Sequence, residues 1–120
     1  MSGTRILIVE DEFLIRLTLA EALGDEGFDV LEAESGDAAL LLIESDPTIR
    51  LMLTDMQLPG TLDGAQLAAR AREHNTELPI IFVTGRPEAM GALLTGRDLF
   101  IAKPYLPSEV CTAARRLIAA

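Results

Sequence analysis

The chain has 120 residues, 49% of them hydrophobic, which is enough for one domain with a buried core but not for two. Its formal net charge of −9 argues against a nucleic-acid-binding surface, because phosphate contacts need clustered lysine and arginine. No hydrophobic run approaches the roughly 18 residues of a membrane span. The single cysteine, Cys111, excludes an internal disulfide and suits a reducing compartment. We therefore expect one cytoplasmic globular domain, residues 1–120, with no direct contact to nucleic acid or membrane.

The first half of the chain alternates between strand-like and helix-like patterns. Ile6–Val9 is an unbroken hydrophobic run, typical of a parallel strand covered on both faces, and it ends in three acids, Glu10 to Glu12. Phe28–Ala33 alternates instead, which predicts a strand near an edge of the sheet. The helices expected between and after these strands have hydrophobic faces at Ile15, Leu19, Ala22 and Leu23, and from Ala38 to Ile43 behind Ser35-Gly36.

The second half continues this alternation, and three of its strands end in a polar group. The run at 51–55 ends in Asp55, the run at 79–83 is followed by Thr84, and the run at 99–102 by Lys103. Helices are predicted from about Ala65 to His74, capped by Asp63, and from about Ser108 onward. Between Gly85 and Gly96 the pattern supports only a short or irregular helix around 88–94.

Five strands alternating with helices predict an α/β fold, a doubly wound (βα)5 three-layer sandwich around a five-stranded parallel sheet. In such a sheet the residues just past the strand ends share one edge. These residues are Glu10, Asp11, Asp55, Thr84 and Lys103, the only lysine in the chain.

Three neighbouring carboxylates repel one another, and a bound cation relieves that repulsion. Oxygen ligands without histidine or cysteine favour Mg²⁺. Mg²⁺ and Lys103 could neutralise a phosphoryl group, Thr84 could donate a hydrogen bond to it, and Asp55, on the middle segment, is the best candidate nucleophile.

Each of these residues also has an ordinary structural explanation. Asp55 and Thr84 are common capping or turn residues, the acids at 10–12 could lie in the first turn of a helix, and Lys103 could be a solvated surface cation. Their joint occurrence at four strand ends favours a site. We expect only structural roles for His74 and Cys111.

The pattern resembles the receiver domain of two-component response regulators over essentially the whole chain. This resemblance implies a flavodoxin-like strand order 2-1-3-4-5, a cis Lys103-Pro104 peptide bond, and no enzymatic activity beyond phosphotransfer to the domain itself and autodephosphorylation. The motifs that carry it are Ile6-Leu7-Ile8-Val9-Glu10-Asp11-Glu12, Leu53-Thr54-Asp55-Met56 with Pro59 and Asp63-Gly64, Val83-Thr84, and Lys103-Pro104-Tyr105.

The resemblance also implies roles for individual residues. Asp55 would accept the phosphoryl group, and Thr84 and Lys103 would hold its oxygens. Phe100 would be the aromatic residue that reorients on activation together with Thr84. The implied Mg²⁺ ligands are Asp11 directly, Glu10 mainly through water, Asp55, and the backbone carbonyl of Gln57.

Two features depart from the common receiver. The segment from Asp55 to the Asp63-Gly64 pair is one residue longer than usual, and the interval from Thr84 to Lys103 is shorter. Pro79–Gly85 is similar, with substitutions at Ile80 and Val83, to the motif of the atypical FATGUY receivers, which are associated with HWE-type histidine kinases and have a reduced fourth helix.

These observations predict a phosphorylation-dependent switch that receives its phosphoryl group from a histidine kinase, for which the HWE type is one candidate, or from a phosphotransfer protein. A downstream partner, an output domain beyond this chain and a homodimer all stay open. One alternative is an interaction module that no longer cycles. Another is a Mg²⁺-dependent phosphohydrolase, which is disfavoured because Gln57, two residues after Asp55, is not an acid that could protonate a leaving group.

Overall fold

The computed structural model describes residues 3–86 and 97–119 and contains a five-stranded parallel sheet in the order β2-β1-β3-β4-β5. This order confirms the doubly wound fold predicted from the sequence. The predicted irregular helix at 88–94 lies outside the described residues, so the label α4 belongs to the C-terminal helix. The elements are β1 (Arg5–Val9), α1 (Phe13–Asp25), β2 (Asp29–Ala33), α2 (Gly36–Ser45), β3 (Ile49–Asp55), α3 (Gly64–His74), β4 (Ile80–Thr84), β5 (Asp98–Ala102) and α4 (Pro107–Ala119).

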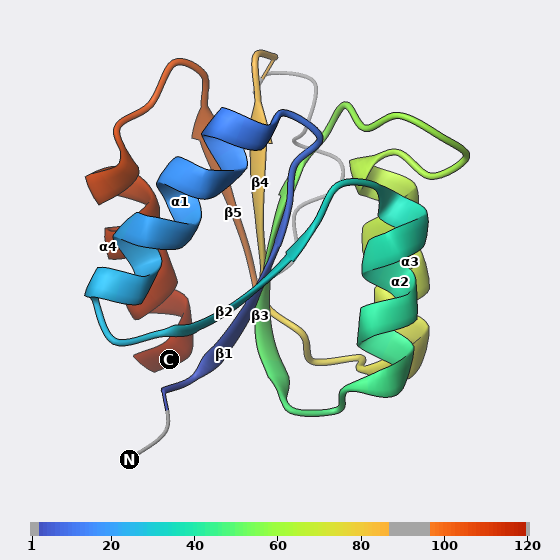
Figure 1. The fold of residues 1–120 in the computed structure, drawn as a ribbon. Helices are drawn as coiled ribbons and strands as arrows, with labels where there is room; N and C mark the ends of the chain where they lie inside the picture. Colours follow the sequence, from blue (N-terminus) through green and yellow to red (C-terminus); the bar gives the residue numbers. More distant parts are fainter. Residues whose placement is uncertain (1–2, 87–96, 120) are drawn as a thin grey trace.

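Helices cover both faces of the sheet. Figure 1 shows α1 and α4 on one side and α2 and α3 on the other, with the strands between them. β2 forms one edge of the sheet, as its alternating sequence predicts. No helix in the described part of the chain is long and hydrophobic enough to cross a membrane.

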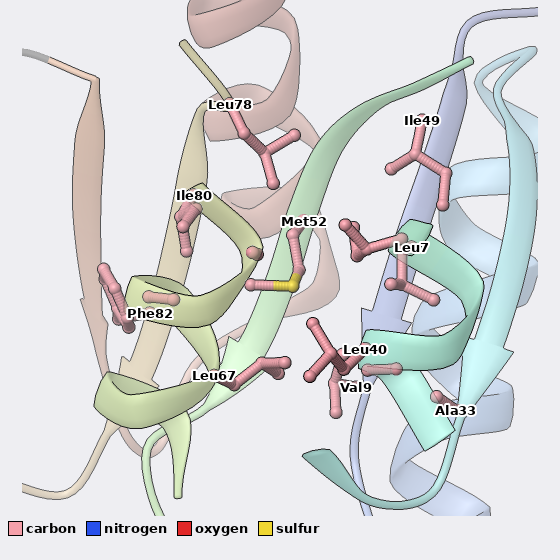
Figure 2. Packing of buried hydrophobic residues seen from close by; sticks show 14 residues of the cluster. Leu7, Val9, Ala33, Leu40, Ile49, Met52, Leu67, Leu78, Ile80 and Phe82 are labelled. Atoms are coloured by element: carbon pink, nitrogen blue, oxygen red, sulfur yellow. The ribbon is translucent and has the colours of Figure 1, made fainter. Parts of the chain in front are cut away.

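Successive residues of the central strands point into opposite halves of the core. Leu7 and Met52 pack with α2 and α3, and Figure 2 shows Met52 at the centre of that group, near Leu67 and Leu40. Ile6 and the residues of β1 and β3 that lie on the same face of the sheet pack with α1 and α4. Because both faces are covered, these strands have unbroken hydrophobic sequences.

Local sequence signals fix where the helices begin. The Ser35 hydroxyl accepts a hydrogen bond from the Ala38 N–H (3.1 Å) at the start of α2. Asp63 caps α3, as predicted, and forms a reciprocal capping box with Gln66. These caps satisfy backbone N–H groups that have no partner within the helix, and they hold the loops in front of α2 and α3 in place.

Candidate functional site at the carboxyl edge of the sheet

Strand register brings the predicted site residues to one edge. Thr54 is paired with Val9, Asp55 with Val83, and Thr84 with Ala102, so β1, β3, β4 and β5 end side by side. Among the described residues, five polar or charged ones are buried, and four of them lie at these strand ends: Glu10, Thr54, Asp55 and Thr84. Buried polar groups cost stability unless they are paired, so this concentration marks a functional edge.

Glu10, Asp11 and Asp55 form an acid cluster in which one carboxylate oxygen from each lies within 4.8 Å of the others. Glu10 and Asp55 are only 5% and 6% exposed, while Asp11 is exposed to solvent. The structure therefore brings together the three carboxylates that the sequence predicts as Mg²⁺ ligands, with an open side at Asp11.

The environment of Glu10 disfavours its charged form. Burial, the largest cause, and the nearby Asp11 and Asp55 side chains together raise the pKa of Glu10 to about 7, against the opposing hydrogen bond from the Glu12 N–H. A divalent cation among these oxygens would offset this penalty. The donor set fits Mg²⁺, because it contains only carboxylate oxygens and is open to water on one side.

Asp55 has a different partner on each carboxylate oxygen. Lys103 Nζ lies 2.6 Å from Oδ2, and the Gln57 N–H donates a hydrogen bond to Oδ1 (3.0 Å). The second contact is the local turn bond that an ordinary structural role would explain, but the first joins residues 48 positions apart. Lys103 is thus held against the buried carboxylate and is not simply a solvated cation.

Thr84 and Lys103 are linked through the backbone. The Lys103 N–H donates to the Thr84 carbonyl (2.8 Å), and the Thr84 hydroxyl accepts a hydrogen bond from the Arg86 N–H (2.9 Å). The turn role left open for Thr84 is therefore real. Within residues 3–86 and 97–119 its hydroxyl hydrogen has no acceptor, since the Arg86 contact uses the oxygen only as an acceptor, so the hydroxyl can donate to a ligand.

The other ordinary explanations fare differently. α1 begins at Phe13 and has no acid in its first turn, so the acids at 10–12 precede the helix instead of lying within it. His74 ends α3 with Nε2 3.3 Å from a Glu44 oxygen, and Cys111 is buried in α4, which agrees with structural roles for both.

Phe100, the predicted switch residue, is half-buried and packs against Phe82 with ring centroids 5.2 Å apart. The Lys103-Pro104 peptide bond is cis, as the resemblance implies.

Sequence reasoning assigned no role to two further residues near the acid cluster. Burial, together with the smaller effect of the Glu10 and Asp55 charges, raises the pKa of Tyr105 to about 12, so the Tyr105 phenol lies within the field of these carboxylates. Arg16 donates to the Glu10 carbonyl (2.8 Å). The adjacency of Tyr105 to Lys103-Pro104 could have pointed to it, whereas Arg16 carries no such signal.

This fold, with these groups at its carboxyl edge, defines a receiver-type domain. The model of the response regulator receiver domain matches residues 6–115, and the chain belongs to this family. Among curated relatives, the aerobic respiration control protein ArcA of Escherichia coli K12 is 39% identical over 98% of this chain and 50% of its own length. The phosphate regulon transcriptional regulatory protein PhoB of Pseudomonas aeruginosa is 36% identical over 98% of this chain and 53% of its own length.

Solved structures agree with this assignment. A response regulator receiver protein from Sinorhizobium medicae superposes with a TM-score of 0.91 at 27% identity, covering 98% of this chain and 96% of that one. The receiver domain of the hybrid histidine kinase CckA gives a TM-score of 0.82 at 31% identity, covering 95% and 98%. The chain spans about half the length of the curated relatives named above.

Proposed function

We propose that residues 1–120 form one cytoplasmic receiver domain that acts as a phosphorylation-dependent signalling switch, with Asp55 as the phosphoryl acceptor. The observation that carries this proposal is the position of Asp55, which is buried between an ammonium group and two further carboxylates at the end of a central strand. A capping or purely structural aspartate needs neither the lysine nor the acid cluster.

In the proposed reaction, an oxygen of Asp55 attacks the phosphorus of a phosphohistidine. A P–O bond forms, the P–N bond breaks, and the imidazole leaves with the electron pair and takes up a proton. Glu10, Asp11, Asp55 and the Gln57 carbonyl would hold Mg²⁺, which would supply positive charge next to the phosphoryl oxygens. Lys103 neutralises a further share of the negative charge on these oxygens, and the Thr84 hydroxyl donates a hydrogen bond to one of them.

The phosphoryl donor is a histidine kinase or phosphotransfer protein, which meets the domain next to Lys103. Phe13 and Leu14 are 59% and 69% exposed at the start of α1, and Leu106 is 64% exposed. Leu14 also lines a groove together with Lys103 and Tyr105. Exposed hydrophobic side chains around a lysine that contacts the acceptor carboxylate provide a docking area close to the reacting atoms.

Phosphorylation adds negative charge to Asp55, a residue that is only 6% exposed and already lies beside two carboxylates. Thr84 and Phe100 then relay the change to a partner surface, either on a separate protein or on an output domain beyond this chain. The motif at 79–85 favours a kinase of HWE type. No activity is proposed beyond accepting the phosphoryl group and losing it by hydrolysis.

The test is phosphorylation of the purified chain by acetyl phosphate with Mg²⁺, followed by intact-mass spectrometry. We expect one added phosphoryl group on the wild type and none on Asp55→Asn. Asp25→Asn, at the exposed end of α1, is the matched control and should be modified normally. If the wild type binds Mg²⁺ but reacts neither with acetyl phosphate nor with beryllofluoride, the result would instead favour an interaction module that no longer cycles.

A further inference from the structure

The segment between β3 and α3, residues 56–63, forms a compact loop whose ends touch. The Gly64 N–H donates to the Met56 carbonyl (3.0 Å), and a Cβ on Gly64 would lie only 2.5 Å from the Asp55 carbonyl oxygen. The side chains of Leu58 and Leu62 pack against the core. Loops with closed ends and internal packing hold a defined shape and frequently carry function.

The far side of this loop is fastened to the first turn of α2. The Thr61 hydroxyl donates to the Asp37 carboxylate, with distances of 2.8 and 3.1 Å to its two oxygens. Next to it, Leu62 packs so closely on Gly36 that a Cβ there would lie 2.8 Å from the Leu62 carbonyl oxygen and from its Cβ. We call these two contacts, Thr61–Asp37 and Leu62–Gly36, the loop clasp.

Gln57 lies between the fixed base of the loop and the clasp. Its N–H is bound to Asp55 Oδ1 (3.0 Å), so the peptide on its other side, which carries the Gln57 carbonyl, depends on the course of residues 58–62. A side-chain ligand can adjust by changing rotamer, but a backbone carbonyl moves only with its loop.

We propose that the loop clasp positions the Gln57 carbonyl for Mg²⁺, which makes Thr61 and Asp37 positioning residues of the site although neither belongs to the acid cluster. This inference rests on the proposed function. The clasp orders the loop before the cation arrives. Without the clasp, Mg²⁺ binding itself must order the loop, and the free energy that this ordering costs makes the binding weaker.

The experiment is a Mg²⁺ titration of the unphosphorylated protein, followed by backbone amide NMR shifts, on wild type and Thr61→Val. This variant keeps the shape of the side chain and removes the donor. We expect roughly two- to tenfold weaker Mg²⁺ binding, the range set by loss of one hydrogen bond to a charged, exposed acceptor. Thr61→Ser, which keeps the hydroxyl, should bind like wild type.

Thr48→Val is the matched control. The Thr48 hydroxyl also donates to an aspartate, Asp46, but at the opposite end of β3. Urea unfolding without Mg²⁺ should give similar losses for Thr48→Val and Thr61→Val, while only Thr61→Val changes Mg²⁺ affinity. A merely structural role for Thr61 would move the unfolding transition and leave the affinity unchanged.

Removing Asp37 also removes a negative charge near the cation, which by itself changes Mg²⁺ affinity. A double-mutant cycle with Asp37→Ala separates this charge effect from the effect of losing the Thr61–Asp37 hydrogen bond. In the Asp37→Ala background, Thr61→Val should have no further effect on affinity. Unchanged affinity in Thr61→Val, or equal effects in both backgrounds, would overturn the inference while leaving the proposed function intact. If wild type itself binds no Mg²⁺, the proposed function fails.

Discussion

Gly64 offers the sharpest test of how the site is held together. A Cβ at this position would lie 2.5 Å from the Asp55 carbonyl oxygen and 2.7 Å from the Met56 Cα. Both are backbone atoms, one of them in Asp55, the proposed acceptor, so neither can turn aside as a flexible side chain would. Gly64→Ala must therefore push α3 away from the end of β3.

The size of the effect follows from two opposing contributions. Replacing glycine by alanine in a helix gains up to about 1 kcal/mol, and less at the first position, where Gly64 lies. Inserting a methyl group into a packed contact costs typically about 1–3 kcal/mol. We expect a net loss of about 1–2 kcal/mol in the free energy of unfolding, with weaker Mg²⁺ binding because Asp55 is displaced.

Urea unfolding of Gly64→Ala and of a matched variant, Gly24→Ala, measures this directly. Gly24 lies within α1, and a Cβ there would have no atom within 4 Å, so its substitution should stabilise the protein. Opposite signs for the two variants are expected. Equal stabilisation of both would refute the close-contact argument and show that α3 can shift at little cost.

Three further predictions concern the core, the acid stability and the cation. Leu67→Ala, at a fully buried site, should lower the free energy of unfolding by about 2–5 kcal/mol in urea; a loss below about 1 kcal/mol would contradict its central packing. Hydrogen bonds from Thr48 and Arg5 hold the pKa of Asp46 at about 2, below its ordinary 3.8. The contribution of Asp46 to stability is therefore complete above pH 3.8 and lost as the pH falls through 2, so the stability gap between wild type and Asp46→Asn should shrink over that window in unfolding curves. Mg²⁺ at about 100 times its dissociation constant should stabilise the protein by about 2.7 kcal/mol against an EDTA-treated sample in thermal or urea unfolding, and Asp11→Ala should lose most of this gain; an undiminished gain would place the cation elsewhere.

The order of the elements could be predicted from the sequence because the hydrophobic signal is strong where both sheet faces are covered. The main error is at the start of β3, which was predicted at Leu51 but begins at Ile49. Arg50 is exposed and separates Ile49 from the hydrophobic run, which hides the pattern, whereas the pairing of Ile49 with Arg5 shows that the strand continues. Hydrophobicity therefore identified the covered part of the strand but not its full length.

That the candidate residues lie close together could be predicted, because a parallel sheet collects the ends of its strands at one edge. Their hydrogen bonds could not. Lys103 meets Asp55, and Thr61 meets Asp37, across 48 and 24 residues of chain. Sequence patterns report periodicity over a few turns, and a polar residue in a turn-rich segment looks the same whether its side chain faces water or clasps another element.

Receivers that share the same motifs can still differ in the residues that support the site. In the proposed reaction the acid cluster and Lys103 carry the chemistry, but their geometry depends on residues outside the motifs. Arg16 bonds the Glu10 carbonyl and also forms an ion pair with Glu32 (3.1 Å), so it ties one end of the acid cluster to β2. The loop clasp fastens residues 61 and 62 to α2. If the clasp positions the Gln57 carbonyl as proposed, two chains with identical motifs will differ in cation affinity when they differ at such supporting positions, because these positions determine how far the loop is ordered before Mg²⁺ binds.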